Sequence, residues 1–423
     1  MSRAGQGDAV GGVFRVVAAT FLAVHSLRGQ PVAGLAPSGD ARAVRLDFET
    51  DDATDDLVAT MSHGRRCFVS AKRAVGNNRH LKDTVLGWVG QMDSGSDEDL
   101  LVLAAEDLTG VVKDLDEALR RRRAGRRLAD GHRKAIAAVT RYVPPEIAED
   151  LLDRVRVLHI PSSTGTSLTR TLLESMAGYL VEDGGGAAVV SALSDSFAAL
   201  AGDASASTEQ DWVRALGRGS RRVIADGTGP PGMRLAAGLA AHEAYVRGLT
   251  ASRGRIDLTL LAEDLPPVTM DGLVDGLRVE LGQGETDLGY GLVRAARRWR
   301  RMLLVGQPGA GKSVALRELA ADCADDPHAP LPIHVRLPEL MRDSSEEVTV
   351  DSLVAAAAGR LSDPGLRAAL ARQMRQELDD GTALLLCDGL DECGTHAAWM
   401  AQQLKDVIDG LHPRAGFVVA TPR

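Results

Sequence analysis

The chain contains one glycine-rich segment followed by a lysine and a serine, residue types that together can hold a phosphate group and a metal ion. The segment is Gly306-Gln307-Pro308-Gly309-Ala310-Gly311-Lys312-Ser313, between an apolar run at 302–305 and a helical pattern at 314–319. Glycines permit a close approach of the backbone, so the loop amides can converge on an anion at a helix N-terminus. In this pattern Lys312 reaches the β and γ phosphates of a nucleotide, and the Ser313 hydroxyl holds Mg²⁺.

Three carboxylates stand at the end of a second apolar run. Residues 383–387 are apolar, and Asp388, Asp391 and Glu392 follow them. A continuous apolar run is typical of a central parallel strand, and ligands bind at the carboxyl ends of such strands. We therefore expect Asp388 to hold Mg²⁺ through a water molecule. Asp391 or Glu392 would orient or polarise the water that attacks the γ phosphate.

A third apolar run, at 416–420, ends in Thr421-Pro422-Arg423. It predicts another buried strand, and Arg423 at its end is placed to contact the γ phosphate.

These segments together resemble NACHT-type NTPases, the signal-transduction ATPases of the STAND class that include animal inflammasome receptors and bacterial antiviral proteins. The sequence Asp-Gly-Leu-Asp-Glu at 388–392 resembles their Walker B motif, and residues 331–337 resemble their second strand. The final Thr-Pro-Arg resembles their sensor 1, with Pro422 where Ser or Thr is usual. The resemblance implies a P-loop NTPase with a doubly wound parallel sheet over 265–423, incomplete at its C-terminus, and ATP and Mg²⁺ as cofactors.

A second group of chemically active residues lies near the N-terminus, on a predicted hairpin of 57–60 and 67–72. Ser70 and Lys72 are two apart, so they point to the same face of a strand. Asp55 and Asp56 precede the partner strand, and Glu49 ends a strand predicted at 43–49. Carboxylates at the ends of adjacent strands can hold Mg²⁺, and a nearby lysine can orient water or stabilise charge on a phosphate. A further strand at 100–104 is predicted between helices at 80–91 and 108–123.

Over about residues 10–125 this pattern resembles the PD-(D/E)xK nucleases, in particular the double-stranded DNA nuclease domains of bacterial antiphage effectors. The resemblance implies a restriction-endonuclease-like α/β domain at 1–127, with Asp56 as a metal ligand. Ser70 stands where Glu or Gln is usual in that family. A neutral hydroxyl is a weak ligand for Mg²⁺, so a domain that binds without cutting is the alternative.

Composition constrains the partners of the protein. With 49 basic and 58 acidic residues the net charge is −9, so any contact with nucleic acid must come from a local patch. The densest basic run comprises Arg120, Arg121, Arg122, Arg123, Arg126 and Arg127. It fits either the phosphate backbone of DNA or an ordinary solvated helix end. Residues 128–264 are mainly helical, and we interpret them as a connector.

Other features favour a reducing, cytoplasmic location without membrane contact. The four cysteines have no paired spacing typical of a zinc site or a disulfide framework. The apolar run 16–27 is short and contains His25, so it predicts an amphipathic helix rather than a signal peptide or a membrane span.

The leading hypothesis is an ATP-driven switch that oligomerises with itself on sensing a phage or cellular trigger and activates an N-terminal DNA endonuclease. The alternative is a nucleotide-switched regulatory or scaffold protein with an inactive nuclease-like domain. A constitutive ATP-driven machine is a third class, but no helicase motif is found.

Overall fold

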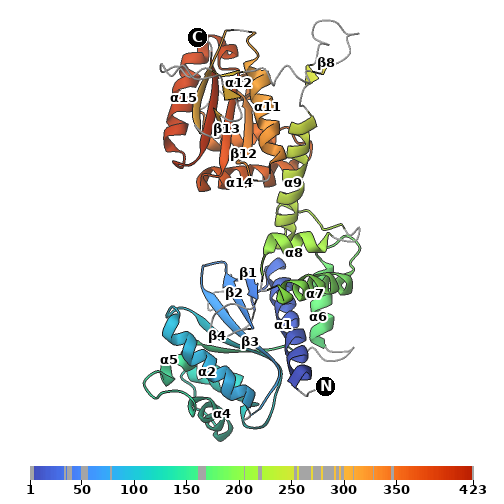
Figure 1. Ribbon diagram of the computed structural model, residues 1–423, viewed down its shortest axis with the longest axis vertical. Coiled ribbons are helices and arrows are strands. Elements are labelled where there is room, and N and C mark those ends of the chain that lie inside the picture. The colour runs from blue at the N-terminus through green and yellow to red at the C-terminus, as the bar shows by residue number, and fades with distance from the viewer. Residues whose placement is uncertain are drawn as a thin grey trace. The chain divides into compact units, whose positions relative to one another are not determined.

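The computed structural model divides the chain into two compact units, residues 1–236 and 237–423 (Figure 1). It describes the chain apart from residues 1–3, 33–34, 36–40, 49–55, 77–78, 161–167, 204, 218–221, 252–254, 257–267, 270–277, 280–289, 292–294, 297–299, 308, 327, 344–346 and 422–423.

The N-terminal unit is built on a six-stranded mixed sheet with the order β5-β4-β3-β2-β1-β6. The first three strands form an antiparallel meander, and β4 and β5 continue the sheet in parallel with β3. The strands are β1 (Ala43–Phe48), β2 (Leu57–Met61), β3 (Arg66–Val75), β4 (Leu100–Leu108), β5 (Val155–His159) and β6 (Ala206–Thr208). The strands predicted at 43–49, 57–60, 67–72 and 100–104 are therefore present.

Helices cover both faces of this sheet. On one face Phe68, Leu101 and Leu103 pack with Leu81 and Trp88 of α2, and all five side chains are buried. On the other face α1 contacts β1 and β3, and Figure 1 shows α1 and α2 on opposite sides of the sheet. The helices are α1 (Ala4–Leu27), α2 (Arg79–Ser94), η1 (Gly110–Val112), α3 (Leu115–Arg123), α4 (Asp130–Thr140), α5 (Ala148–Arg154), α6 (Leu168–Gly178), α7 (Gly186–Gly202), α8 (Glu209–Leu216) and α9 (Pro231–Ala251).

The apolar run near the N-terminus lies in α1, where Phe14, Ala18, Leu22 and Leu27 are buried in the core of the unit. In the part of the chain that the structure describes, no helix combines the length and the apolarity that crossing a bilayer needs. The burial of Phe14, Ala18, Leu22 and Leu27 makes these four side chains core residues.

Much of the region predicted as a connector belongs to the N-terminal unit. β5 extends the sheet beyond β4, and β6 pairs with the outer edge of β1. Val155 and Val157 pack into the same core as Phe68. The division between the two units falls within α9, and not at residue 127 or 264. Short strands of this kind are hard to recognise because their partners are distant in the sequence.

The C-terminal unit contains a parallel sheet with the order β11-β14-β13-β12. Its main elements are β11 (Arg301–Val305), α11 (Lys312–Asp325), β12 (Leu331–Arg336), α12 (Leu337–Asp343), α13 (Val350–Ala358), α14 (Pro364–Asp380), β13 (Ala383–Asp388), η3 (Asp391–His396), α15 (Ala397–Gly410) and β14 (Gly416–Thr421). The two-residue strands β7 (Arg255–Ile256) and β8 (Val268–Thr269) pair with each other, as do β9 (Arg278–Val279) and β10 (Tyr290–Gly291).

The apolar run before Asp388 forms the central strand β13, whereas β11 at the edge of the sheet is only partly covered by the described residues, with Leu303 65% exposed. Figure 1 shows α11 and α15 on opposite sides of β13, whose six residues are all buried. Since β11 and β13 are parallel, the glycine-rich loop after Val305 and the carboxylates that begin at Asp388 reach the same edge of the sheet. This arrangement confirms the α/β fold that the sequence predicts for this part of the chain.

The second half of α9 completes the core of the C-terminal unit. Ala241, Tyr245 and Leu249 are buried there together with Ile333 and Leu385. The core of the C-terminal unit therefore includes a helix that lies outside residues 265–423.

Candidate nucleotide-binding site

The loop between β11 and α11 has the backbone that a phosphate cradle needs. Gly309 and Gly311 have φ angles of 79° and 81°, in the left-handed region that favours glycine. Gly311 is the N-cap residue of α11, so the first amides of a 14-residue helix are directed into the loop. A Cβ at Gly306 would stand 3.3 Å from the Cβ of Ala310. Pro308 lies outside the described residues.

Lys312 is folded back over this loop. Its Nζ donates hydrogen bonds to the carbonyl oxygens of Gly306 at 3.0 Å and Gln307 at 3.2 Å. It also forms an ion pair with Asp391, with 3.3 Å between Nζ and Oδ2. The ammonium group therefore lies at the mouth of the loop, where a phosphate would compete with Asp391 for it.

Ser313 and Asp388 meet across the site. The Ser313 Oγ donates a hydrogen bond of 2.8 Å to Oδ1 of Asp388, and Asp388 is 4% exposed. Burial raises the pKa of the Asp388 carboxyl, while the bond from Ser313 acts in the opposite direction. A hydroxyl and a carboxylate are oxygen ligands of the kind that Mg²⁺ prefers, alongside nucleotide phosphates and water. These two residues therefore fit a magnesium ion.

The two carboxylates that follow lie on η3. Glu392 pairs with Arg336 at the end of β12, with 3.0 Å between Oε2 and Nη2. Asp391 pairs with Lys312, as described above. Gly389, with a φ of 79°, makes the turn that leads from the strand into η3. The structure thus gives the two carboxylates different partners, which the sequence did not distinguish.

One polar residue of this region was not singled out from the sequence. His334 lies in the middle of β12, is 1% exposed, and has its Nε2 atom 4.0 Å from Oδ2 of Asp388. Burial lowers the pKa of His334 to about 3, and the charge of Arg360 acts in the same direction. The sequence contained one signal that could have identified His334, which is a histidine within an apolar run. A buried imidazole requires hydrogen-bond partners, so such a position deserves a search for them.

Arg423, the predicted contact for the γ phosphate, lies outside the described residues, and its role remains a prediction. Glu49 and Asp55 of the N-terminal group also lie outside them.

The N-terminal group is brought together in part. Lys72 Nζ forms an ion pair of 2.7 Å with Oδ2 of Asp56, and the backbone amide of Ala71 donates to the same oxygen at 2.9 Å. Ser70 is buried on the same strand. Within the described residues, no cluster of three or more His, Cys, Asp or Glu side chains could hold a metal ion. The described residues therefore do not by themselves make up a metal site at this position.

The basic run on α3 is largely neutralised within the chain. Arg120 and Arg121 pair with Asp116 and Glu117 on the same helix. Arg122 pairs with Glu149 and Asp153, and Arg123 donates to the carbonyl oxygen of Val155. These contacts favour the solvated helix end over a DNA-binding surface.

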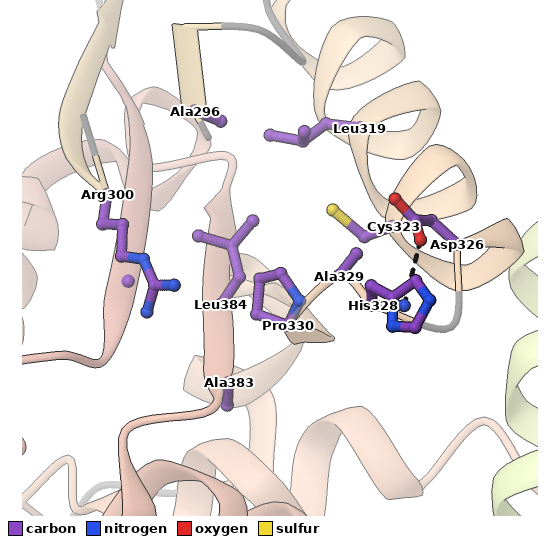
Figure 2. A pocket seen from close by; sticks show the side chains of 11 residues that line it. Ala296, Arg300, Leu319, Cys323, Asp326, His328, Ala329, Pro330, Ala383 and Leu384 are labelled. Carbon is purple, nitrogen blue, oxygen red and sulfur yellow. Dashed lines mark hydrogen bonds between the residues drawn. The ribbon is translucent and has the colours of Figure 1, made fainter. Parts of the chain in front are cut away.

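A cavity of about 230 Å³ opens at the amino ends of β12, β13 and β14. Figure 2 shows Arg300 on one side of it, Asp326 and His328 on the other, and Leu384 between them. The amide of His328 donates a hydrogen bond of 2.9 Å to Asp326. The glycine-rich loop follows the carboxyl end of β11, so this cavity lies at the opposite edge of the sheet and is separate from the nucleotide site.

The cradle before α11, the lysine, and the serine that meets a buried aspartate at the end of a neighbouring strand define a P-loop NTPase. Residues 300–422 match the model of the NACHT domain. The NACHT match agrees with the class of P-loop NTPases that the site defines, and with nucleotide binding by this class.

Comparison with solved structures gives distant likenesses. Nothing among curated proteins matches the sequence. The Cap4 SAVED/CARF-domain containing receptor of Acinetobacter baumannii, solved with the cyclic trinucleotide 2'3'3'-cAAA, has 11% identity and a TM-score of 0.33, covering 48% of this chain and 44% of that one. The Cap4 receptor of Moraxella osloensis has 10% identity and a TM-score of 0.33, with coverages of 71% and 80%. The chain thus spans less than half the length of the first, and likeness at this level carries no ligand or activity across.

Proposed function

We propose that the C-terminal unit binds ATP with Mg²⁺ and hydrolyses it, and that this cycle switches the protein between two states. The observation that carries the proposal is the contact between Ser313 and Asp388 beside the N-terminus of α11. These groups provide ligands for a cation, and the loop amides and Lys312 provide contacts for phosphate.

Each residue has a distinct task in this proposal. The loop amides and Lys312 neutralise the β and γ phosphates, and Ser313 and Asp388 hold Mg²⁺, which when bound draws charge from the phosphate oxygens. Glu392, which pairs with Arg336 and not with Lys312, is proposed to orient the attacking water, with Asp391 as the alternative. Arg423 is proposed to contact the γ phosphate and report its presence.

The test is Mg²⁺-dependent release of phosphate from ATP, with GTP measured alongside. Lys312→Ala should reduce turnover at least about 100-fold, the usual effect of removing one preorganised charged donor. Lys405→Ala is the matched control, because Lys405 pairs with Asp409 on the exposed surface of α15, away from the loop. Equal turnover in wild type and Lys312→Ala would refute the proposal.

For the N-terminal unit we propose a DNA nuclease fold that the NTPase controls. The supporting observations are the element order α1-β1-β2-β3-α2-β4 with an antiparallel meander followed by a parallel strand, and the ion pair between Asp56 and Lys72. This is the arrangement that a restriction-endonuclease-like domain requires. Double-stranded DNA, assembly into a homo-oligomer and a phage or cellular trigger belong to this proposal, as does a role in antiviral defence.

Plasmid degradation in the presence of Mg²⁺ and ATP tests the nuclease. Lys72→Ala should abolish it, whereas Lys82→Ala on the exposed face of α2 should leave it intact. Nicking that persists in Lys72→Ala would exclude this site. If an ATP-bound, oligomeric sample leaves DNA uncut, the buried Ser70 marks a site that has lost its metal, and the protein acts as a nucleotide-switched scaffold.

A further inference from the structure

His334 occupies a place where an apolar residue would be expected. It is the fourth residue of β12, between the buried Ile333 and Val335. Burying an imidazole costs more than burying leucine unless its nitrogen atoms find partners. Its position therefore calls for a reason beyond packing.

The hydrogen bonds of His334 fix its tautomer. The Arg360 Nη2 lies 2.7 Å from Nδ1 of His334. A guanidinium can only donate, so Nδ1 must accept, and the proton of the neutral ring resides on Nε2. The backbone amide of His334 donates to the hydroxyl of Tyr245 on α9 at 3.1 Å, which holds the strand at this point.

The protonated nitrogen faces the carboxylate that the nucleotide site uses. Nε2 of His334 is buried, lacks a hydrogen-bond partner among the described residues, and lies 4.0 Å from Oδ2 of Asp388. The other oxygen, Oδ1, accepts from Ser313. When the Ser313 hydroxyl turns to a cation, the carboxylate loses this contact and keeps the hydrogen bond from the backbone of Gly389. A small shift of Asp388 toward His334 then closes the 4.0 Å separation to a hydrogen bond at Oδ2.

We propose that His334 is a positioning residue of the nucleotide site, whose Nε2–H fixes the Asp388 carboxylate in the orientation that holds Mg²⁺. The inference rests on the proposed binding of ATP with Mg²⁺. Arg360 determines which nitrogen carries the proton, and Tyr245 holds the backbone, so these two residues act on Asp388 through His334.

The test compares two replacements of similar size in the full chain. His334→Leu removes the donor, whereas the side-chain amide of His334→Gln can present an N–H close to the place of Nε2. The readout is the dissociation constant of ATP measured in EDTA and in Mg²⁺, and the ratio of the two values is the gain that Mg²⁺ provides. Circular dichroism verifies that each variant is folded.

We expect His334→Leu to reduce this gain about tenfold, the effect of one hydrogen bond to a charged group, while the dissociation constant in EDTA stays within about twofold of wild type. His334→Gln should recover most of the gain. If His334→Leu does not fold, Arg360→Met decides, because Arg360 is exposed and its loss frees the proton to move to Nδ1. Arg360→Met should then show a reduced gain.

Two results would overturn the inference. One is a gain in ATP affinity from Mg²⁺ that is the same in His334→Leu as in wild type. Where His334→Leu does not fold, the same result in Arg360→Met counts instead. The other is an equal loss of affinity in EDTA and Mg²⁺, which is the mark of a purely structural role. A wild-type protein that binds ATP without any gain from Mg²⁺ would instead contradict the proposed function, so the two failures are distinguishable.

Discussion

Ser313 Oγ lies 2.8 Å from Oδ1 of Asp388, so two residues that are 75 positions apart in the chain share one hydrogen bond at the edge of the sheet. A cation that takes Ser313 Oγ as a ligand, and Asp388 directly or through a water molecule, must replace this bond. The hydrogen bond therefore holds the Ser313 and Asp388 side chains together at the proposed position of the ion when no cation is bound.

Ser313→Ala should lower the Mg²⁺-dependent part of ATP affinity about tenfold, because a ligand and the partner of Asp388 are lost together. Affinity in EDTA should change little, since the loop amides and Lys312 remain. Isothermal titration calorimetry with and without Mg²⁺ measures both quantities. Ser313→Thr keeps the hydroxyl and is the control, and an equal loss in that variant would contradict the role of the hydroxyl.

Asp391→Asn should tighten the binding of ATP in EDTA about fivefold, corresponding to ~1 kcal/mol for an ion pair that is partly open to solvent. The reason is that Lys312 no longer has to leave Asp391 before it reaches a phosphate. The control is Asp409→Asn, which breaks a lysine pair on the surface of α15. Weaker binding in Asp391→Asn would show that this carboxylate supports the nucleotide instead of competing with it.

The stability of the N-terminal unit should depend on pH through His25. This residue is packed against Phe21, with 4.4 Å between ring centroids, and burial lowers its pKa below the ordinary value of 6.5. Below pH 6.5 the unfolded chain binds a proton more readily than the folded one, so stability present above pH 6.5 is lost as the pH falls.

His25→Phe removes this effect, so its free energy of unfolding should fall less than that of wild type between about pH 7.5 and 5.5. Urea unfolding followed by tryptophan fluorescence measures it, since Trp88 and Trp212 are both buried in this unit. Parallel pH profiles for the two proteins would show that His25 does not titrate in this window.

Thiol reagents should leave Cys67 and Cys387 unmodified in the folded protein. Burial raises the pKa of each thiol to about 12, so almost no thiolate is present near neutral pH. Mass spectrometry after a brief treatment with iodoacetamide should find both residues free, and a sample in denaturant should show both labelled. Rapid labelling of either one without denaturant would disprove their burial.

The sequence predicted the parts of the nucleotide site that depend on local patterns. A strand, a glycine-rich turn and a helix follow one another directly around Lys312, and the apolar run before Asp388 marks a central strand. Both patterns are set by neighbours in the chain, so no distant contact is needed to recognise them.

Such local patterns could not predict contacts between segments that are distant in the sequence. The pairs Lys312 with Asp391 and His334 with Arg360 join elements that are separated by many residues, and side-chain geometry decides which carboxylate or nitrogen is used. The same holds for β6, whose three residues show no strand pattern of their own and are ordered by pairing with β1.

The course of α9 has a consequence for dividing the protein into pieces. Met233 and Ala236 are buried in its first half, and Tyr245 and Leu249 complete the core of the second unit. A recombinant boundary at residues 236–237 would leave each half of α9 with the unit whose buried side chains it contributes. A boundary at the start or at the end of α9 would instead take buried side chains away from one of the two units.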